Sequence, residues 1–531
     1  MINNDIVQKL WNLCDILRDD GINYSDYVTE LVLLLCIKMV HENTEAGILK
    51  KHPLPEGCRW TDLNSKSGLG LLNDYKTILS VLATGKKTEA NPKKKGQPIE
   101  IQVHEDHLIK AIYLDAQTRL REPRHLEQII RTLDKIDWFS AQKDGLGDLY
   151  EGLLEKNASE TKSGAGQYFT PRALINCMVR CIKPQPGEVI QDPATGTAGF
   201  LVAAHEYVKS STNNLKDLGT REQNFQKKKA YVGVELVSNT RRLALMNCLL
   251  HGIEGDEQGA VQLGSTLSEL GQNLPQADII LANPPFGTSK GGDASNTRDD
   301  LTYKTSNKQL TFLQHIYRNL KPGGRAAVVF PDNVLFDSGV GTEVRRDFMN
   351  KCNLHTILRL PTGIFYAQGV KTNVLFFTKG SVKDKYQVEN CTKNVWVYDL
   401  RSNMPSFGKR TPFSEHYLAP FEKVFGKKSD GNSKRTEGEW SFGAEEIELD
   451  SVEENDEANS KYAHSRWRCF SRQWISERKG DSLDISWLKD ARTVDTLKLP
   501  EPSVLALDAK SDLVAALVEL DELLAALEEI M

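Results

Sequence analysis

Apolar positions recur at helical spacing through the first part of the chain. The period is seen at Leu10, Leu13 and Leu17, and again at Tyr27, Leu31, Leu34 and Leu35. Spacings of three and four residues place apolar side chains on one face of a helix. We therefore predict a helical N-terminal domain over residues 1–150.

The pattern changes between about residues 163 and 380, where short apolar runs alternate with helical segments. Six runs are predicted as strands, at 188–192, 231–235, 260–263, 277–282, 325–330 and 354–360. Strands that alternate with helices are typical of a largely parallel sheet. A seventh run, 372–378, follows a loop too short for a crossover helix, so we expect this strand to be antiparallel. The predicted fold class over residues 151–380 is a doubly wound α/β domain.

The remainder of the chain has a weaker pattern and then a strong one. Residues 381–510 contain polar stretches at 427–436 and 445–460, and we predict a mixed extension with loops there. Residues 511–531 instead carry an apolar seam, with alternating spacings of four and three, at Leu513, Leu517, Leu520, Leu524, Leu527 and Met531. This is the pattern of a coiled-coil helix, and we expect it to pack against helices of another subunit or back onto this chain.

The length and net charge of the chain limit the number of domains and the ways in which it could bind DNA. A chain of 531 residues exceeds what one core usually organises, so several domains are expected. The net charge of -5 does not suit a protein that binds nucleic acid through its overall charge, so any DNA contact must be local or shared with a partner. The local candidates are Lys86, Lys87, Lys93, Lys94 and Lys95. A solvated loop is the more ordinary interpretation of such a charge run.

Cysteine usage and hydropathy bear on the compartment. The nine cysteines show no paired CxxC units, which argues against a disulfide framework and a structural zinc site, and no metal site is predicted. The first residues lack the pattern of a signal peptide, and the most apolar run, 31–40, is too short to cross a bilayer. We expect a soluble, cytoplasmic protein without membrane contact.

The sharpest chemical signal is Asn283-Pro284-Pro285-Phe286, directly after the apolar strand 277–282. Open α/β sheets bind ligands beyond the carboxyl ends of their strands. The Asn283 side-chain oxygen and the Pro284 carbonyl can accept both protons of an adenine N6 amine, and so localise its lone pair. The prolines stiffen the turn, and Phe286 offers a flat face for a base extruded from a duplex. An ordinary strand-ending turn is the alternative for the tetrapeptide alone.

Two further strand ends carry candidate binding residues. The glycine turn 192–200 follows the first strand and opens a helix, and Gly196 and Gly199 allow a bound cofactor to approach the backbone closely. Glu235 ends the second strand, where an acid can accept hydrogen bonds from both ribose hydroxyls. Each has a structural alternative, a tight strand-to-helix turn and a helix N-terminal acid. The segment 287–308, rich in small and polar residues, lacks apolar anchors, and we expect it either to order over bound DNA or to be a surface excursion.

In their order and spacing, these motifs resemble the modification subunit of type I restriction-modification systems, a family of N6-adenine DNA methyltransferases. Three more segments support the resemblance, at 310–315, 321–325 and 329–333. The resemblance covers most of the chain. It implies a Rossmann-like fold that binds S-adenosylmethionine, flanked by the helical N-terminal domain and the terminal helix.

The resemblance also implies roles for individual residues. Asn283, Pro284, Pro285 and Phe286 match the catalytic motif. The cofactor set comprises Gln167, Tyr168, Phe169, Thr170, Asp192, Ala194, Gly196, Thr197, Gly199, Phe200, Glu235 and Ser265. Residues 166–172 match the segment that holds the cofactor's methionine end. Ser265 departs from the acid or amide that the family often carries to bind the cofactor adenine.

The implied activity is methylation of a flipped adenine in double-stranded DNA, with sequence choice supplied by a separate specificity subunit. Two such chains with one specificity subunit, joined by restriction subunits for cleavage, form the implied assembly. Three alternatives remain open: a self-sufficient adenine methyltransferase that recognises DNA through residues 381–510, a protein glutamine methyltransferase, and a non-catalytic DNA-binding or assembly module.

Overall fold

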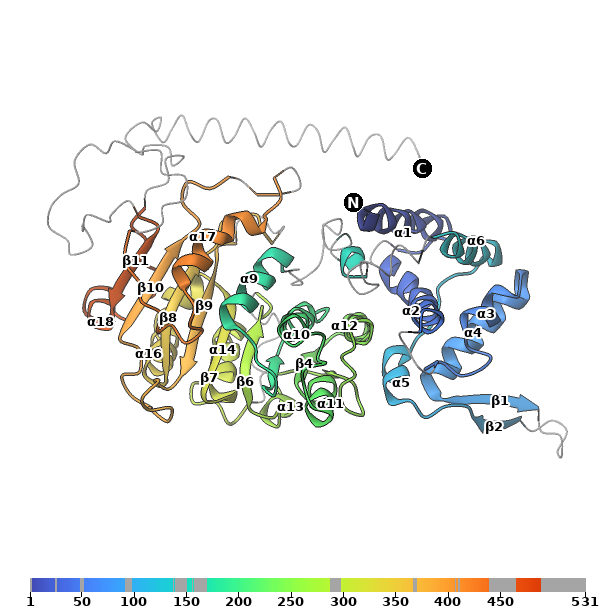
Figure 1. Cartoon of the computed structure of the whole chain (residues 1–531), viewed down its shortest axis with the longest axis horizontal. Coiled ribbons are helices and arrows are strands. Elements are labelled where there is room, and N and C mark those ends of the chain that lie inside the picture. Colours follow the sequence, from blue (N-terminus) through green and yellow to red (C-terminus); the bar gives the residue numbers. More distant parts are fainter. Residues whose placement is uncertain are drawn as a thin grey trace.

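A long sheet covered by helices and a group of N-terminal helices make up the computed structural model of the chain (Figure 1). It describes residues 2–23, 26–47, 52–90, 98–136, 138, 150–154, 156, 170–286, 298–365, 370–405, 407–408, 411–438 and 465–488. Gln167, Tyr168, Phe169 and the predicted terminal helix at 511–531 lie outside these residues.

The N-terminal region is helical, as the spacing predicts, with one hairpin that the pattern does not predict. Its helices are α1 (Ile2–Asp19), α2 (Tyr27–Glu45), α3 (Trp60–Asn64), α4 (Gly68–Thr84), α5 (His107–Tyr113) and α6 (Pro123–Asp134). The hairpin pairs β1 (Lys86–Ala90) antiparallel with β2 (Pro98–Gln102). Lys86 and Lys87 are exposed on it and pair with Glu100 and Glu89, at 2.8 and 3.1 Å. These two lysines therefore fit the solvated interpretation of the charge run.

The sheet confirms the predicted fold class. Its strands are β3 (Ile190–Asp192), β4 (Tyr231–Glu235), β5 (Val261–Leu263), β6 (Ala277–Ala282), β7 (Leu320–Pro331), β8 (Cys352–Arg359), β9 (Thr372–Lys379), β10 (Asn394–Asp399) and β11 (Trp467–Ser471). They lie in the order β11-β10-β8-β9-β7-β6-β3-β4-β5. The strand β9 runs antiparallel between β7 and β8, as its short preceding loop predicts, and the strands from β5 to β7 are mutually parallel.

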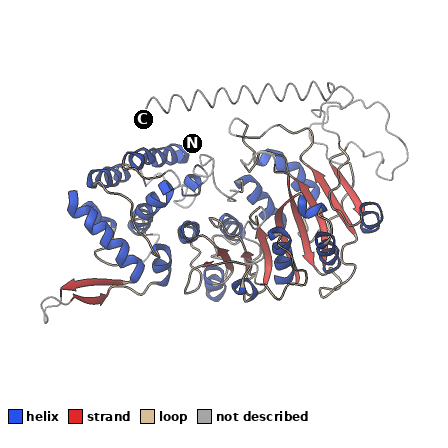
Figure 2. Cartoon of the chain, turned by 180° about the vertical axis from the view of Figure 1, so that it is seen from behind, coloured by secondary structure: helices blue, strands red, loops and turns tan. Residues whose placement is uncertain are grey.

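Helices cover both faces of this sheet (Figure 2). Alternate residues of β6 belong to different cores: Ile279 and Leu281 to one, Ile280 and Ala282 to the other. The first face packs against α9 (Arg172–Ile182), α10 (Gly199–Ser211), α12 (Ser238–His251) and α17 (Glu415–Phe425). The second packs against α14 (Lys308–Asn319), α15 (Asn333–Phe336) and α16 (Val340–Lys351). The remaining helices are α11 (Thr220–Lys228), α13 (Glu269–Gln272) and α18 (Arg472–Lys479).

The extension after residue 380 is more ordered than the sequence pattern predicts. Within the described residues the sheet has nine strands rather than seven, because β10 pairs parallel with β8 and β11 pairs antiparallel with β10. Arg401 connects the extension to the end of β7, because it donates to both carboxylate oxygens of Asp332, each at 2.8 Å. Buried charged residues such as Arg468 interrupt the apolar pattern of β11, so the sequence does not predict this strand. The strand β10 does contain an apolar run, at 395–398, which we did not predict as a strand.

The N-terminal helices pack against α12, which directly follows the end of β4. Arg242 of α12 is buried and donates to the carbonyls of Ile112 and Leu114, at 2.8 and 2.6 Å. The Tyr150 hydroxyl donates to the Leu243 carbonyl at 3.3 Å, so the segment between the two regions also docks on α12. A helix adjacent to the candidate cofactor strand therefore supports the N-terminal region.

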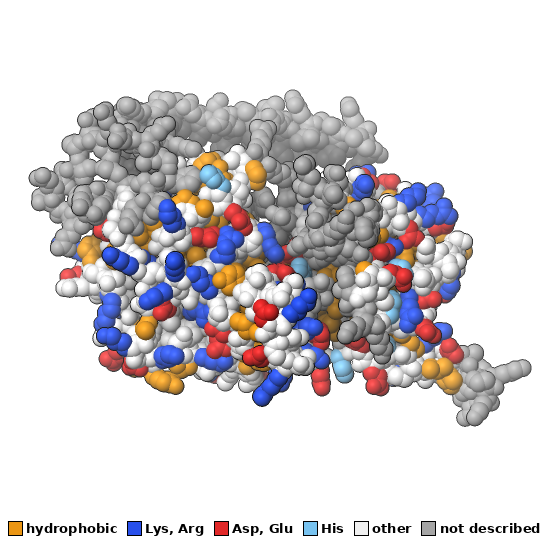
Figure 3. Space-filling model, viewed as in Figure 1, with side chains coloured by type: hydrophobic (Ala, Val, Ile, Leu, Met, Phe, Trp, Pro, Cys, Tyr) orange, Lys and Arg blue, Asp and Glu red, His pale blue; other side chains and the backbone are white. Residues whose placement is uncertain are grey.

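Every helix in the described part of the chain is too short or too polar to cross a bilayer. On the face shown in Figure 3, basic and acidic side chains are interspersed over both regions. This view agrees with the small net charge of the chain, -5.

Candidate active site

Three neighbouring strands bring the predicted site residues to one edge of the sheet. β3 lies between β6 and β4, and the three strands are parallel. Asp192 is the last residue of β3, Glu235 is the last of β4, and Asn283 directly follows β6. The carboxyl ends of adjacent parallel strands form the place where open sheets bind ligands. The structure therefore brings together motifs separated by up to about ninety residues of sequence.

The glycine turn after β3 folds closely over β4. The Thr195 amide donates to the Val234 carbonyl at 3.0 Å, and the Thr195 hydroxyl donates to the Asp192 carbonyl at 2.8 Å. A Cβ atom on Gly233 would lie 2.4 Å from the Thr195 hydroxyl, so only glycine fits beneath this turn. Gly196 has a positive φ of 55°, and a Cβ atom there would meet open space. The turn thus leaves room above its backbone for a ligand.

Two carboxylates border this turn. Glu235 accepts hydrogen bonds from the Gly196 and Val237 amides, at 3.0 and 2.8 Å, and its burial raises its pKa. Asp192 accepts from the Ala194 amide at 3.0 Å through Oδ1. Its Oδ2 is buried and has no hydrogen-bond partner among the described residues. Burial, reinforced by the charge of Glu235, raises the pKa of Asp192 to about 8.

The buried Asp192 oxygen is a test of whether a cofactor fits here. Buried polar atoms are almost always hydrogen-bonded, so Oδ2 indicates a donor that belongs to a ligand or to water. The open space above Gly196 and the acceptor oxygens of Glu235 suit a ligand that carries both hydroxyl and amine donors. These residues fit the nucleoside and amino acid parts of S-adenosylmethionine.

The loop after β5 joins the same site through a residue that the sequence did not indicate. Ser265, the predicted adenine contact, accepts from the Leu267 amide at 3.2 Å. The buried Thr266 donates to the Pro193 carbonyl at 2.6 Å, which connects this loop to the glycine turn. No sequence motif distinguishes Thr266 from its neighbour, because its partner is more than seventy residues away.

The turn after β6, which carries the predicted catalytic residues 283–286, is contacted by segments that are distant in sequence. We call it the catalytic turn. The Asn283 side-chain amide donates to the Thr170 hydroxyl at 2.9 Å, and Thr170 is buried. Thr170 was assigned to the cofactor by resemblance, and in the structure its hydroxyl orients Asn283. Phe286 is half-buried and meets Phe365 edge-on, with ring centroids 6.1 Å apart. The Pro285 carbonyl accepts from the Gln309 side chain at 3.3 Å.

The remaining predicted cofactor residues have varied surroundings. The Thr197 carbonyl accepts from the Asn247 side chain at 2.9 Å. Gly199 begins α10 where a Cβ atom would lie 3.0 Å from the Ile175 side chain, and Phe200 is buried in the core. These two residues hold the turn by packing. Ala194 donates its amide to Asp192, as described above.

The prediction that the segment after the catalytic turn lacks anchors is wrong for residues 298–308. Arg298 is 1% exposed, donates to both oxygens of Asp300 at 2.6 and 2.7 Å, and donates to the Thr266 carbonyl at 2.9 Å. Leu301 is buried. The buried arginine therefore anchors this backbone to the loop after β5. Residues 287–297 lie outside the described part of the chain.

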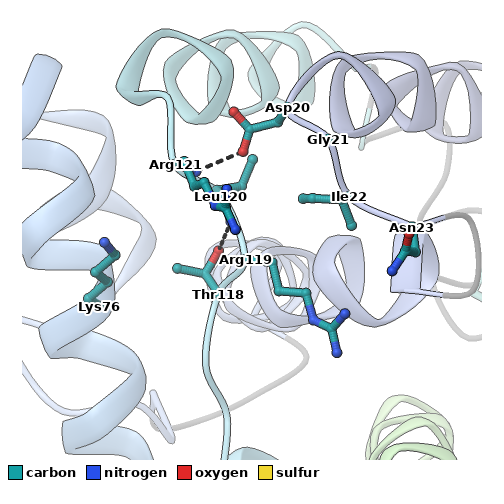
Figure 4. Close-up of a pocket in the computed structure, with 9 residues that line it drawn as sticks. All are labelled: Asp20, Gly21, Ile22, Asn23, Lys76, Thr118, Arg119, Leu120 and Arg121. Carbon is teal, nitrogen blue, oxygen red and sulfur yellow. Dashed lines mark hydrogen bonds between the residues drawn. The ribbon is translucent and has the colours of Figure 1, made fainter. Parts of the chain in front are cut away.

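A separate hollow lies in the N-terminal region (Figure 4). Its lining includes Lys76, Arg119 and Arg121, and none of the predicted site residues. The Asp20 carboxylate at its edge already accepts from the Arg121 and Glu122 amides, at 2.7 and 3.1 Å. Among the described residues there is also no cluster of side chains that could hold a metal ion. The strand ends therefore remain the candidate site.

Comparison with protein families agrees with this geometry. A model described as N-6 DNA methylase matches residues 141–468. The N-terminal domain model of the type I methylase subunit (HsdM) matches residues 6–133, and a model of the C-terminal domain of that subunit matches residues 499–530. The three matches follow one another along the chain and include the site.

Individual relatives are similar over almost the whole chain. The StySPI methylase subunit of Salmonella potsdam is 55% identical over 99% of this chain and 95% of its own length. The EcoKI methylase subunit of Escherichia coli (strain K12) is 54% identical over the same shares. A crystal structure of the EcoKI M protein, 51% identical, covers 98% of this chain and 96% of that protein with a TM-score of 0.59. A structure from a study of type I complex assembly, 23% identical with a TM-score of 0.63, shares the fold.

Proposed function

The chain belongs to the methylase subunits of type I restriction enzymes, within the N-6 DNA methylase family, and we propose that it transfers a methyl group from S-adenosylmethionine to the N6 amine of a flipped adenine in double-stranded DNA. One observation carries the proposal. The acceptor side chain of Asn283 and the carboxylates of Asp192 and Glu235 stand at the ends of three adjacent parallel strands.

The glycine turn and Glu235 form the cofactor side of the proposed site. S-adenosylmethionine supplies an electrophilic methyl group on its sulfonium when bound. Glu235 uses one lone pair of each oxygen on the Gly196 and Val237 amides, and its remaining lone pairs can accept ribose hydroxyls. Asp192 Oδ2 is left for a cofactor donor, and Ser265 is assigned to the adenine end on resemblance. Gln167, Tyr168 and Phe169 complete the proposed set on resemblance alone.

Asn283 and Pro284 act on the amine. A substrate amine conjugated with a ring is a weak nucleophile, and two acceptors drawing on its protons localise the lone pair. The Asn283 amide nitrogen donates to Thr170, so Oδ1 points away from Thr170, and Oδ1 is the proposed acceptor. Pro284 and Pro285 restrict the turn, so the Pro284 carbonyl keeps its direction.

Phe286 acts on the base. An adenine inside a duplex is out of reach, so it must leave the stack and bind between flat or apolar surfaces. Phe365 meets the Phe286 ring edge-on, a favourable aromatic arrangement that fixes the position of the ring.

The proposed partners follow from the family. We propose that a specificity subunit chooses the DNA sequence, that two copies of this chain flank it, and that restriction subunits join for cleavage in the cytoplasm. The seam leucines from Leu513 to Leu527 lie within the match to the C-terminal domain of type I methylase subunits, which supports an assembly role. The described part of residues 381–510 extends the sheet through β10 and β11, and this disfavours a self-sufficient enzyme with a recognition domain there.

Methylation mapping tests the proposal. Host DNA is sequenced by long-read methods with the gene intact, deleted, or carrying Asn283→Ala. We expect one N6-methyladenine motif, in two parts separated by unspecified bases, which disappears on deletion and in the variant. A motif that persists in the Asn283→Ala strain contradicts the catalytic assignment, and a continuous short motif contradicts the partnership with a specificity subunit.

A further inference from the structure

We infer that Glu151, in the segment between the N-terminal helices and the catalytic domain, is a positioning residue that holds the cofactor turn and the catalytic turn in register. The inference rests on the proposed roles of those two turns. Glu151 itself reaches neither of them. Its partner Asn247 contacts the cofactor turn, and its partner Arg172 lies two residues after Thr170, which contacts Asn283.

Glu151 is placed by packing between the two regions. Its neighbour Tyr150 is fully buried and donates to the Leu243 carbonyl of α12 at 3.3 Å. A Cβ atom on Gly152 would lie 3.0 Å from the side chain of Val7 in α1, so the backbone runs close against the N-terminal helices. The Glu151 side chain is only 14% exposed. Because the backbone and the side chain of Glu151 are both packed, the position of its carboxylate is fixed, and this constrains its partners Arg172 and Asn247.

The first partner leads to the catalytic turn. Arg172 begins α9, and its Nη1 lies 2.5 Å from both carboxylate oxygens of Glu151. Thr170 is two residues earlier and accepts the hydrogen bond from the Asn283 amide at 2.9 Å. Pro171 stands between them and restricts the backbone. The Glu151–Arg172 pair therefore determines where the Thr170 hydroxyl lies, and through it the direction of Asn283.

The second partner leads to the cofactor turn. Asn247 of α12 is 1% exposed, and its side-chain nitrogen donates to Glu151 Oε1 at 3.3 Å and to the Thr197 carbonyl at 2.9 Å. Oδ1 of Asn247 has no hydrogen-bond partner among the described residues. The amide thus takes its orientation from Glu151 and Thr197, and it fixes the peptide between Thr197 and Ala198.

Because the two partners lead to different turns, we expect their substitutions to change the methylation rate and the cofactor Kd separately. Arg172→Met should lower the single-turnover methylation rate at saturating S-adenosylmethionine about fivefold, with cofactor Kd within about twofold, because it removes support for Thr170 alone. Asn247→Leu should raise the cofactor Kd about fivefold and leave the saturated rate within about twofold. Glu151→Gln should change both the rate and the Kd, because a neutral amide accepts less strongly from Arg172 and from Asn247.

The experiment uses the complete complex with its DNA target for rates, and calorimetry with S-adenosylmethionine for Kd. Glu188→Gln is the matched control, because Glu188 also forms a half-buried pair, with Arg325 at 2.6 Å, away from the site. The control should lower the melting temperature and move neither rate nor Kd. Adding Glu151→Gln to Arg172→Met should lower the rate no further, since both changes break one contact.

Two results overturn the inference. One is a Glu151→Gln protein that loses melting temperature like the Glu188→Gln control and keeps both the rate and Kd. The other is a set of Arg172 and Asn247 variants that change rate and Kd together in equal proportion. Asn283→Ala in the same assays distinguishes a failure of the proposed function from a failure of the inference about Glu151. Full methyl transfer by that variant overturns the proposed function. The cofactor Kd of the Glu151 and Asn247 variants still tests the link from Glu151 to Thr197.

Discussion

The cofactor side and the catalytic side of the proposed active site are positioned by different kinds of contact. On the cofactor side, two acidic side chains accept hydrogen bonds from the backbone of one turn: Asp192 accepts from the amide two residues later, and Glu235 accepts from Gly196, in the turn after the neighbouring strand. On the catalytic side, Asn283 depends on Thr170, 113 residues distant, and Phe286 depends on Phe365.

This difference indicates which part of the fold each half requires. The cofactor turn is held mainly by β3 and β4, with one further hydrogen bond each from Thr266 after β5 and from Asn247 of α12. The catalytic turn needs the segment before α9 and the loop after β8 to be in place. We therefore expect damage to distant segments to impair methyl transfer before it impairs cofactor binding.

The largest expected effect tests the catalytic half alone. Asn283→Ala should lower the single-turnover methylation rate about 100-fold or more, since it removes an acceptor that acts in the transition state. Cofactor Kd should stay within about twofold, because Asn283 is not part of the cofactor turn. A tritiated-methyl assay measures the rate. Asn319→Ala is the control, a buried asparagine that donates to Gln191 at 2.7 Å elsewhere and should keep the rate.

The next effect tests the cofactor half alone. Glu235→Ala should raise the Kd for S-adenosylmethionine by about 10- to 100-fold, because charge-assisted hydrogen bonds to the ribose and to the Gly196 amide are lost together. Calorimetry measures this change. The exposed acid Glu269 serves as control, and Glu269→Ala should bind normally. Equal affinities for the two variants would place the ribose elsewhere.

A smaller effect tests the dependence of the catalytic turn on a distant segment. Thr170→Val should reduce the methylation rate about fivefold, because Asn283 loses the hydrogen bond that directs its amide. Cofactor Kd should change less than the rate. Thr212→Val removes a comparable buried hydroxyl, which donates to the Val208 carbonyl at 2.7 Å, and should leave the rate intact. A greater change in Kd than in rate would return Thr170 to the cofactor side.

The smallest effect concerns the pH dependence of stability on the cofactor side. Burial raises the pKa of Asp192 from 3.8 to about 8, so the folded protein binds a proton that the unfolded chain releases. Stability from this group is therefore full below the lower value and is lost as pH rises to about 8. Without cofactor, the melting temperature of the wild type should fall more steeply over this range than that of Asp192→Asn. Parallel curves for the two proteins would show that Asp192 is already ionised.

The local pattern predicts the bounds of some strands well. The bounds of β4 and β6 coincide with the predicted 231–235 and 277–282, because both are short apolar runs with clear ends. The strand β7 begins at Leu320, five residues before its predicted start, because Lys-Pro-Gly-Gly at 321–324 interrupts the apolar run. The strand β11 was missed because its buried positions include Arg468, whose guanidinium lies over the Phe470 and Trp487 rings.

The sequence by itself determined which residues end the strands and therefore which chemistry is available there. Hydrophobic period, glycine and proline act over a few residues, so the positions of Asp192, Glu235 and Asn283 at strand ends follow from local pattern. Only the tertiary structure decided how these residues are held. Thr170 against Asn283, Thr266 against Pro193, and Glu151 between Arg172 and Asn247 join segments far apart in the chain. Such contacts depend on the order of strands and the packing of helices, which no local pattern of apolar and polar residues contains.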